Sequence, residues 1–269
     1  MLEDTTIAFL GGGNMASAIL HGLIEAKVAP LQIRVSDPVE KQRNTIANQY
    51  RVIVFGKNRD AIVDADLVVV AVKPHLVTHV LKEIAEHLKP NAIVLSIAAG
   101  ITLSAMRKQL DKKQPLVRVM PNTPALIGAG ISALVGADGI EDDQLAQAEA
   151  LLSAVGKTVR LSDEALMDGV TALSGSGPAY IFMMIEALSD GGVSCGLPRP
   201  LADQLALQTI IGSAQLAQES GLHPGELKNQ VTSPGGTTIA GLTALERHGV
   251  RGALIDAVRA AWKRAKELA

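Results

Sequence analysis

The sequence predicts an α/β protein in two parts, a doubly wound parallel sheet with crossover helices followed by an all-α part. Short β-branched runs alternate with helix-length segments over the first 162 residues, as in sheets built from βαβ units. One run, residues 66–72 (DLVVVAV), is apolar on both faces, which is typical of a central parallel strand covered on both sides. From Asp163 to Ala269 no convincing strand pattern occurs.

The elements follow in order from these patterns. Strands are expected at residues 6–10, 32–36, 51–55, 66–72, 92–98 and 115–120. The segments between them are long enough for crossover helices. After residues 156–162 the character changes, and amphipathic helices are expected at residues 164–173, 178–193, 200–221, 238–249 and 250–269. We therefore predict a first domain over residues 1–162 and a helical second domain over residues 163–269.

Composition restricts the class of protein. The 269 residues are 48% hydrophobic, which is enough for a sizeable core. The net charge is −2 and only 2% of residues are aromatic, so neither a nucleic-acid nor a membrane surface is expected. No targeting segment and no apolar stretch of ~18 residues is recognised, which favours a cytoplasmic protein with small-molecule partners.

A glycine-rich turn follows the first expected strand. In the stretch LGGGNMASAIL, Gly11-x-Gly13-x-x-Ala16 stands between a strand and an alanine-rich helix. This is the pattern of a Rossmann dinucleotide-binding turn, in which Gly11 allows the tight turn, Gly13 lets the pyrophosphate approach, and Ala16 allows close helix packing. The anion would rest on the helix N-terminus. The alternative is a glycine turn that binds nothing.

An acidic residue, Asp37, follows the second expected strand about 20 residues after the turn. Such an acid accepts hydrogen bonds from the ribose hydroxyls and repels a 2′-phosphate, which favours NAD. Lys41 and Arg43 follow closely, and they either cover a phosphate or form a solvated helix face. Both NADPH and NADH therefore stay open as cofactors.

Three further stretches lie where expected strands end, which is the edge at which open α/β sheets bind ligands. They are VVVAVKPH, SIAAG and VMPNTPA. Lys73 in the first is interpreted either as a contact to a cofactor phosphate or ribose, or as a solvated lysine. Asn122 in the third either orients the nicotinamide or substrate, or belongs to a structural turn.

Two glycine-rich breaks in the helical part predict the other half of a site. Residues 173–180 (LSGSGPAY) predict a helix end and a new helix with Pro178 at its first position. Residues 231–241 (VTSPGGTTIAG) predict a helix with Ser233 as N-cap and Pro234 as first residue. The glycine pair that follows costs a helix about 0.5–1 kcal/mol per glycine, which suggests that a small carboxylate comes close. An ordinary proline-started helix is the alternative.

Metal and nucleophile sites have weaker support. His75 and His79 are four residues apart but lack a third ligand, so no metal site is expected. Cys195 is the only cysteine, which excludes an internal disulfide, and no base can be assigned to it. No Ser/His/Asp arrangement stands out, so hydrolase chemistry is not expected.

Six stretches, taken together, resemble the pyrroline-5-carboxylate reductase family. They are FLGGGNMASAI, VAVKPH, SIAAG, MPNTPA, LSGSGPAY and VTSPGGTT, in that order over nearly the whole chain. The resemblance implies NAD(P)H-dependent reduction of 1-pyrroline-5-carboxylate to L-proline, the last step of proline biosynthesis, by hydride transfer to a cyclic iminium. It also implies a helical domain that interleaves with a second subunit, in a homodimer that assembles further into a ring such as a decamer.

The same resemblance implies the site residues. It places the cofactor at Gly11, Gly12, Gly13, Asn14, Met15, Ala16, Asp37, Asn58, Val72, Lys73, Pro74, Ala98, Ala99 and Gly100. It places the substrate at Asn122, Ser176, Ser233, Gly236, Thr237 and Thr238. Thr238 and Ser176 are the expected catalytic residues, with the Thr238 hydroxyl bonded to the ring nitrogen and the turn from Ser233 to Thr237 around the carboxylate. The family often has a small polar residue where Asp37 stands, which weakens the family's usual preference for NADPH here.

The expected chemistry needs little from the protein. A protonated cyclic imine is already a good hydride acceptor, so no strong general acid is required, and positioning supplies most of the rate. The lack of an obvious catalytic His or Asp is consistent with this.

Two other functions fit part of the pattern. A β-hydroxyacid dehydrogenase shares the fold plan, but it needs a catalytic lysine in a K-x-x-x-N pattern early in the second domain, and residues 163–200 contain no lysine. A dinucleotide sensor would bind NAD(P) without turnover, and a spectrophotometric assay separates it from the reductase.

Overall fold

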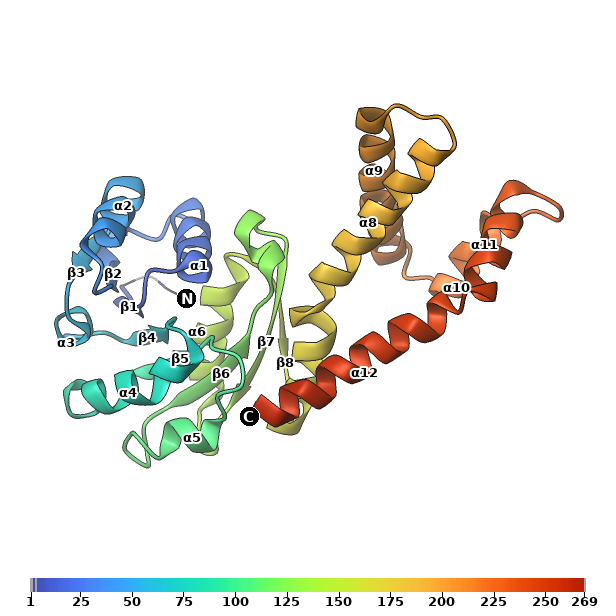
Figure 1. The fold of residues 1–269 in the computed structure, drawn as a ribbon. Helices are drawn as coiled ribbons and strands as arrows, with labels where there is room; N and C mark the ends of the chain where they lie inside the picture. The colour runs from blue at the N-terminus through green and yellow to red at the C-terminus, as the bar shows by residue number, and fades with distance from the viewer. Residues whose placement is uncertain (1, 3, 269) are drawn as a thin grey trace. The chain divides into compact units, whose positions relative to one another are not determined.

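The chain divides into two compact units in the computed structural model, which describes residue 2 and residues 4–268 (Figure 1). The first unit runs to Ser176 and includes the chain from Ala261 onward, and the second is Gly177–Ala260. The predicted domain boundary after Ser162 lies earlier than this division, because Met167 and Ala172 are buried in the first unit. The predicted ends at Met1 and Ala269 lie outside the described residues.

The first unit is built on a single eight-stranded sheet, with the strands in the order β3-β2-β1-β4-β5-β6-β7-β8. Neighbouring strands are parallel except for β6 and β7, which are antiparallel. The bounds are β1 Ile7–Leu10, β2 Ile33–Ser36, β3 Ile53–Phe55, β4 Leu67–Val70, β5 Ile93–Ser96, β6 Leu116–Met120, β7 Gly130–Gly136 and β8 Gly156–Arg160. The six predicted strands are confirmed, and so is the doubly wound α/β class.

β7 and β8 were not predicted. β7 has the sequence GISALVG, in which glycines at both ends leave only a short apolar run as a strand signal. β8 reads GKTVR, and its side chains are exposed or half-buried, so that the alternation of a half-buried strand is missing. Pairing between them, with Gly130 opposite Gly156 and Leu134 opposite Arg160, makes them strands.

Helices cover both faces of the sheet and separate the core into two clusters. One cluster joins Ile7 and Phe9 of β1 to α1 and α6, and the other joins Ala8 and Leu10 of β1 to α4 and α5. The α-helices of this unit are α1 Asn14–Glu25, α2 Glu40–Tyr50, α3 Asn58–Ala61, α4 Pro74–Ile84, α5 Leu103–Arg107, α6 Asp142–Ser153 and α7 Met167–Val170. Short turns are η1 Pro30–Gln32, η2 Ala85–His87, η3 Thr123–Ile127, η4 Glu164–Leu166 and the π turn η5 Thr171–Gly175.

The second unit consists of helices, and no strand occurs among described residues 163–268, as predicted. It holds α8 Gly177–Ser194, α9 Arg199–Ser220, α10 Pro224–Gln230, α11 Thr237–Arg247 and the first part of α12 Val250–Leu268. The short helix α10 was not predicted; the His223 ring caps it by accepting a hydrogen bond from the Gly225 N–H. Within the described chain, no helix combines the length and the apolar character needed to cross a membrane.

Candidate cofactor and substrate site

The glycine turn joins β1 to α1 where three strands end together. Gly11 has φ +99°, and its N–H donates to the carbonyl of Ser36 at the end of β2, at 2.8 Å. A Cβ on Gly11 would lie 2.8 Å from the Ala71 carbonyl oxygen and 3.0 Å from Val72 Cγ1. Because an L side chain is strained at this φ and has no room there, only glycine suits this position.

The start of α1 is open on its outer side. Gly13 is the N-cap, it is exposed, and no atom lies within 4 Å of the place where its Cβ would be. No side chain of the described residues caps this helix end. Asn14 is exposed, Met15 is half-buried, and Ala16 is buried against the strand. The free N–H groups of the first turn therefore form a place for an anion.

Asp37 holds the glycine turn from the end of β2. Its Oδ2 accepts the Gly12 N–H at 3.0 Å and its Oδ1 accepts the Val39 N–H at 2.9 Å. Arg43 lies close by and donates from Nη1 to the carbonyls of Asp37, at 2.8 Å, and Pro38, at 3.0 Å. The carboxylate therefore faces the glycine turn, while the Arg43 guanidinium covers the backbone at the strand end.

The remaining predicted cofactor residues lie at the same sheet edge. Leu10 pairs with Ser36 and Val70, and Val70 pairs with Ser96, so that the loops after these strands are adjacent. The half-buried Val72, Lys73 as N-cap and Pro74 as first residue of α4 follow β4. Ala98, Ala99 and Gly100 follow β5, where Ala98 is buried and Ala99 exposed. Gly100 lies against the Leu268 backbone at the end of α12.

Asn58 is held by bonds within the protein. Its Oδ1 accepts the Ser36 hydroxyl at 2.7 Å, and its Nδ2 donates to Glu83 Oε2 at 2.8 Å. Its amide therefore ties the end of β2 to α4, beside the other predicted cofactor residues.

Asn122 and Ser176 lie at the carboxyl end of β6. Asn122 Oδ1 accepts the Ile131 N–H of β7 at 2.9 Å. Ser176 follows Gly175, and a Cβ on Gly175 would lie 2.5 Å from Met120 Cε, at the end of β6. The structure thus brings Ser176 to the sheet edge that carries the predicted cofactor loops.

The predicted break and new helix at Pro178 are confirmed to within one residue: α8 begins at Gly177, and Ser176 lies in a bend ahead of it. The helical segment before this bend ends in a π turn, in which the Ser176 N–H donates to the Thr171 carbonyl at 2.9 Å, five residues back. The Ser176 hydroxyl donates to the same carbonyl at 3.2 Å. Pro178 has no N–H, and it is the second residue of α8, where a backbone N–H has no partner within the helix. Such π turns occur frequently at functional sites.

The predicted cap at Ser233 is wrong. α11 begins at Thr237, and Gly236 is its N-cap. Gly235 has φ +70°, in the left-handed region, which is incompatible with the helical first turn predicted there. The Gly236 N–H instead donates to the Ser233 carbonyl at 3.1 Å and closes a turn ahead of the helix. Ser233 and Thr237 are exposed and Thr238 is half-buried, all around the N-terminus of α11.

The metal and cysteine candidates gain no support from the described residues. Among the described residues, no three His, Cys, Asp or Glu side chains gather closely enough to hold a metal ion. Cys195 is exposed after α8.

Two residues with important contacts, Gln42 and Arg118, were not among the predicted site residues. Gln42 of α2 donates from Nε2 to the Gly12 carbonyl and so helps Asp37 to hold the glycine turn. Arg118 is a buried charge in β6 that pairs with Glu164. The sequence did carry a signal for this ion pair, because a charged arginine in the middle of the apolar strand LVRVM needs an acidic partner.

Comparison with known proteins decides the family. The family model described as pyrroline-5-carboxylate reductase dimerisation matches residues 164–268. The one described as NADP oxidoreductase, coenzyme F420-dependent, matches residues 6–100. The pyrroline-5-carboxylate reductase of Synechocystis sp. is 47% identical over 263 residues, which cover 97% of each chain. This chain belongs to the pyrroline-5-carboxylate reductase family.

Other members and their structures agree. The pyrroline-5-carboxylate reductase of Pseudomonas aeruginosa is 44% identical and covers 100% of this chain and 98% of its own. The structure from Coxiella burnetii has a TM-score of 0.94 at 38% identity over 98% of each chain. The Plasmodium falciparum enzyme, with NADP bound, has a TM-score of 0.89 at 31% identity and covers 99% of this chain and 98% of its own. The resemblance stated from the motifs is confirmed.

Proposed function

We propose that this chain reduces 1-pyrroline-5-carboxylate to L-proline with NAD(P)H. The observation that carries the proposal is the 47% identity over 97% of both chains to a reductase whose name states this substrate. Three features support NAD(P)H binding. They are the glycine turn, the uncapped start of α1 and the strand-end loops beside them. The bound cofactor supplies the hydride that reduces the imine carbon.

In this proposal the first unit binds the cofactor. The N–H groups at the start of α1 hold the pyrophosphate, because Gly13 leaves the backbone accessible. Asp37 faces the adenosine ribose from the end of β2, and Asn58 keeps that strand end tied to α4. Val72, Lys73 and Pro74, with Ala98, Ala99 and Gly100, line the rest of the cofactor site.

The substrate contacts are proposed for Ser176 and Asn122 in the first unit and for the turn ahead of α11 in the second. That turn presents Ser233 and Gly236, followed by Thr237 and Thr238 at a helix start with no side-chain cap among the described residues. A carboxylate is favoured at such a helix start. Thr238 bonds the ring nitrogen and Ser176 orients the ring, so that positioning supplies most of the rate.

The direct test is NAD(P)H oxidation followed by absorbance. We expect turnover with pyrroline-5-carboxylate and none with hydroxy acids or their keto forms. A folded sample that binds NAD(P)H but turns over with neither cofactor would show a dinucleotide sensor instead.

Asp37→Ser tests the cofactor preference. Asp37 lies where it both holds the ribose and repels a 2′-phosphate. We expect the ratio of kcat/KM values to shift toward NADPH by about tenfold or more, which corresponds to ~1.4 kcal/mol. Since Asp37 also holds the Gly12 and Val39 N–H groups, affinity for both cofactors should fall, and the ratio is the informative quantity. An unchanged ratio in both Asp37→Ser and Asp37→Asn would contradict the role.

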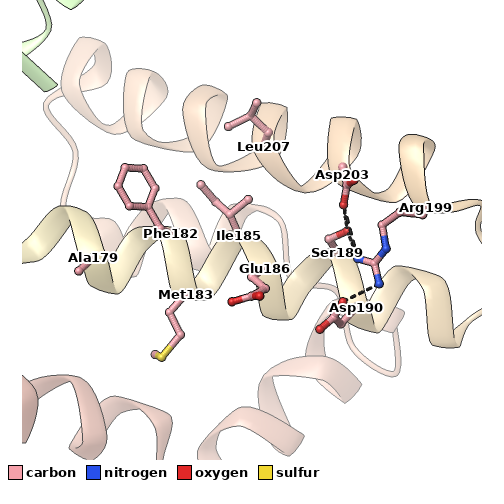
Figure 2. A pocket seen from close by; sticks show the side chains of 10 residues that line it. All are labelled: Ala179, Phe182, Met183, Ile185, Glu186, Ser189, Asp190, Arg199, Asp203 and Leu207. Carbon is pink, nitrogen blue, oxygen red and sulfur yellow. Dashed lines mark hydrogen bonds and ion pairs between the residues drawn. The ribbon is translucent and has the colours of Figure 1, made fainter. Parts of the chain in front are cut away.

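The matched dimerisation family assigns an oligomer to residues 164–268, and we propose a homodimer that assembles into a ring such as a decamer. Figure 2 shows the groove between α8 and α9, which Phe182, Met183 and Leu207 line. Phe182 and Met183 are 65% and 60% exposed, and further exposed apolar side chains on these helices are Ile181, Leu188, Leu201, Leu205 and Leu216. Apolar surface of this extent is rare on a monomer.

A charged cluster lies at one end of the groove. Arg199 donates to Asp190 at 2.6 Å and to the Ser189 hydroxyl at 2.8 Å (Figure 2). This cluster holds α8 and α9 together, so the apolar face is preformed for a second copy.

Light scattering at micromolar concentration tests the assembly. We expect a monodisperse species of at least two chains, because a monomer would leave the α8–α9 face in water. A monodisperse monomer would contradict the proposal. The partners are proposed to be copies of this chain in the cytoplasm, where NAD(P)H is available, and neither nucleic acid nor membrane.

A further inference from the structure

One ion pair of the first unit joins a buried arginine to a half-buried glutamate. Among the described residues, Arg118 is the only charged residue in the buried core, with 5% of its side chain exposed. Its Nη1 donates to Glu164 Oε1 at 2.8 Å, and its Nη2 lies 4.0 Å from Asp168 Oδ1. Arg118 belongs to β6, whereas both carboxylates belong to the segment that follows β8.

The same carboxylate oxygen holds a second element. Glu164 Oε1 also accepts the backbone N–H of Leu103 at 2.8 Å. Leu103 is the first residue of α5, directly after the loop that carries Ala98, Ala99 and Gly100. Glu164 is therefore the point at which β6, the cofactor loop after β5 and the segment ahead of Ser176 meet.

The segment behind Glu164 leads directly to Ser176. It runs through α7 and the π turn, and Gly175 then contacts Met120, two residues beyond Arg118 in β6. The two ends of this segment thus contact the same strand, one through the ion pair and one through Met120.

Stability alone does not account for a charge pair here. Burying the Arg118 charge costs desolvation that its attraction to the half-buried Glu164 roughly repays, and apolar side chains of similar volume often stabilise a core as well or better. A guanidinium does more than fill space, because its N–H groups lie in one rigid plane and hold the carboxylate in one position. Apolar side chains would let the two segments shift relative to each other.

We propose that Glu164 and Arg118 are positioning residues for the reductase reaction, which set the place of Ser176 relative to the cofactor loop at residues 98–100. The proposal rests on the proposed function. Neither residue touches substrate or cofactor in it; both act through Leu103 and through the segment that ends at Ser176.

The test compares three variants with the wild-type protein. Glu164→Gln keeps an oxygen for both hydrogen bonds but removes the charge. Glu164→Ala removes the acceptor and leaves Arg118 without its near partner. The double variant Arg118→Met, Glu164→Leu replaces the pair by apolar side chains, which preserves or raises stability in comparable cases. For each we measure melting temperature, the NAD(P)H dissociation constant, and kcat and KM for pyrroline-5-carboxylate.

We expect stability and catalysis to separate in the double variant. Its melting temperature should stay near wild type while kcat/KM falls about tenfold or more, since small misplacements of reacting groups are costly. The NAD(P)H dissociation constant should rise, because the start of α5 loses its acceptor. Glu164→Gln should recover most of the loss seen in Glu164→Ala. Glu149→Gln is the control, since Glu149 pairs with Arg160 at 2.7 Å on the edge strand β8.

A double variant with wild-type melting temperature, kcat, KM and cofactor affinity would overturn the proposal. If the double variant does not fold, the two single variants decide: kcat/KM should fall in Glu164→Ala, and Glu164→Gln should recover most of that loss. Wild-type kcat, KM and NAD(P)H dissociation constant in Glu164→Ala would then overturn the proposal. If the wild-type protein does not turn over pyrroline-5-carboxylate, the proposed function fails separately, and the NAD(P)H dissociation constants still test the link from Glu164 to the cofactor loop.

Discussion

Replacing Gly13 by alanine should leave the fold intact and weaken NAD(P)H binding by about a hundredfold, because the added methyl keeps the pyrophosphate away from the backbone. Gly13 has φ −72°, and a Cβ there would meet no protein atom within 4 Å. The melting temperature should fall only slightly, since alanine is a poorer N-cap than glycine by about 1 kcal/mol or less. Titration of NADH and NADPH fluorescence and a thermal melt measure both effects.

Gly11→Ala is the matched variant. It should lower stability as well as cofactor affinity, whereas Gly13→Ala should lower mainly affinity. Gly11 has φ +99°, and its Cβ would lie 2.8 Å from the Ala71 carbonyl oxygen, so the melting temperature should fall together with cofactor affinity. Wild-type affinity in Gly13→Ala would show that the pyrophosphate does not approach this turn. Equal losses of stability in both variants would show that Gly13 is structural.

Thr238→Ala should lower kcat/KM for pyrroline-5-carboxylate about ten- to a hundredfold, the loss of one transition-state hydrogen bond of about 1–3 kcal/mol. Thr238 is the second residue of α11. Pro234, one turn earlier, lies in the turn outside the helix, so the usual bond from a helical threonine back to a carbonyl has no helical partner here. The NAD(P)H dissociation constant should stay near wild type, because the residues proposed to bind the cofactor belong to the first unit.

Thr243→Ala is the control within the same helix. The Thr243 hydroxyl donates to the Ile239 carbonyl at 2.8 Å, four residues back, so its loss should cost stability and leave kcat/KM unchanged. Near-normal kcat/KM in Thr238→Ala would remove Thr238 from the site. A large fall in its melting temperature, with a matching fall in active fraction, would make its role structural.

The glycine turn that we propose as the pyrophosphate site was predictable because its residues are close together in the sequence. A strand, a turn that needs φ above zero at Gly11, and a helix start follow one another within ten residues, so their relation in sequence is also their relation in space. Strand ends that carry Asp37, Lys73 and Gly100 could be placed at one edge for the same reason, since parallel strands share their carboxyl edge.

Predictions failed where a distant partner decided the conformation. β7 is a strand because it pairs with β6 and with β8, and β8 is a strand because it pairs with β7; neither has a strand pattern of its own. The rule that proline starts a helix holds at Pro178, where α8 begins at Gly177, and fails at Pro234. There the helix begins only at Thr237, after a separate turn that the Gly236 N–H closes onto the Ser233 carbonyl.

The sequence by itself determined the α/β-to-helical order, the glycine turn and the family, because periodicity, turn chemistry and motifs are carried by residues close together in the chain. Only the tertiary structure decided which groups the polar side chains meet. It turned both Asp37 oxygens toward backbone N–H groups, tied Asn58 between Ser36 and Glu83, and buried Arg118 against Glu164, forty-six residues away. Hydrogen bonds are short and directional, and the partners in these contacts come from different strands and helices, so their pairing depends on how the whole unit packs.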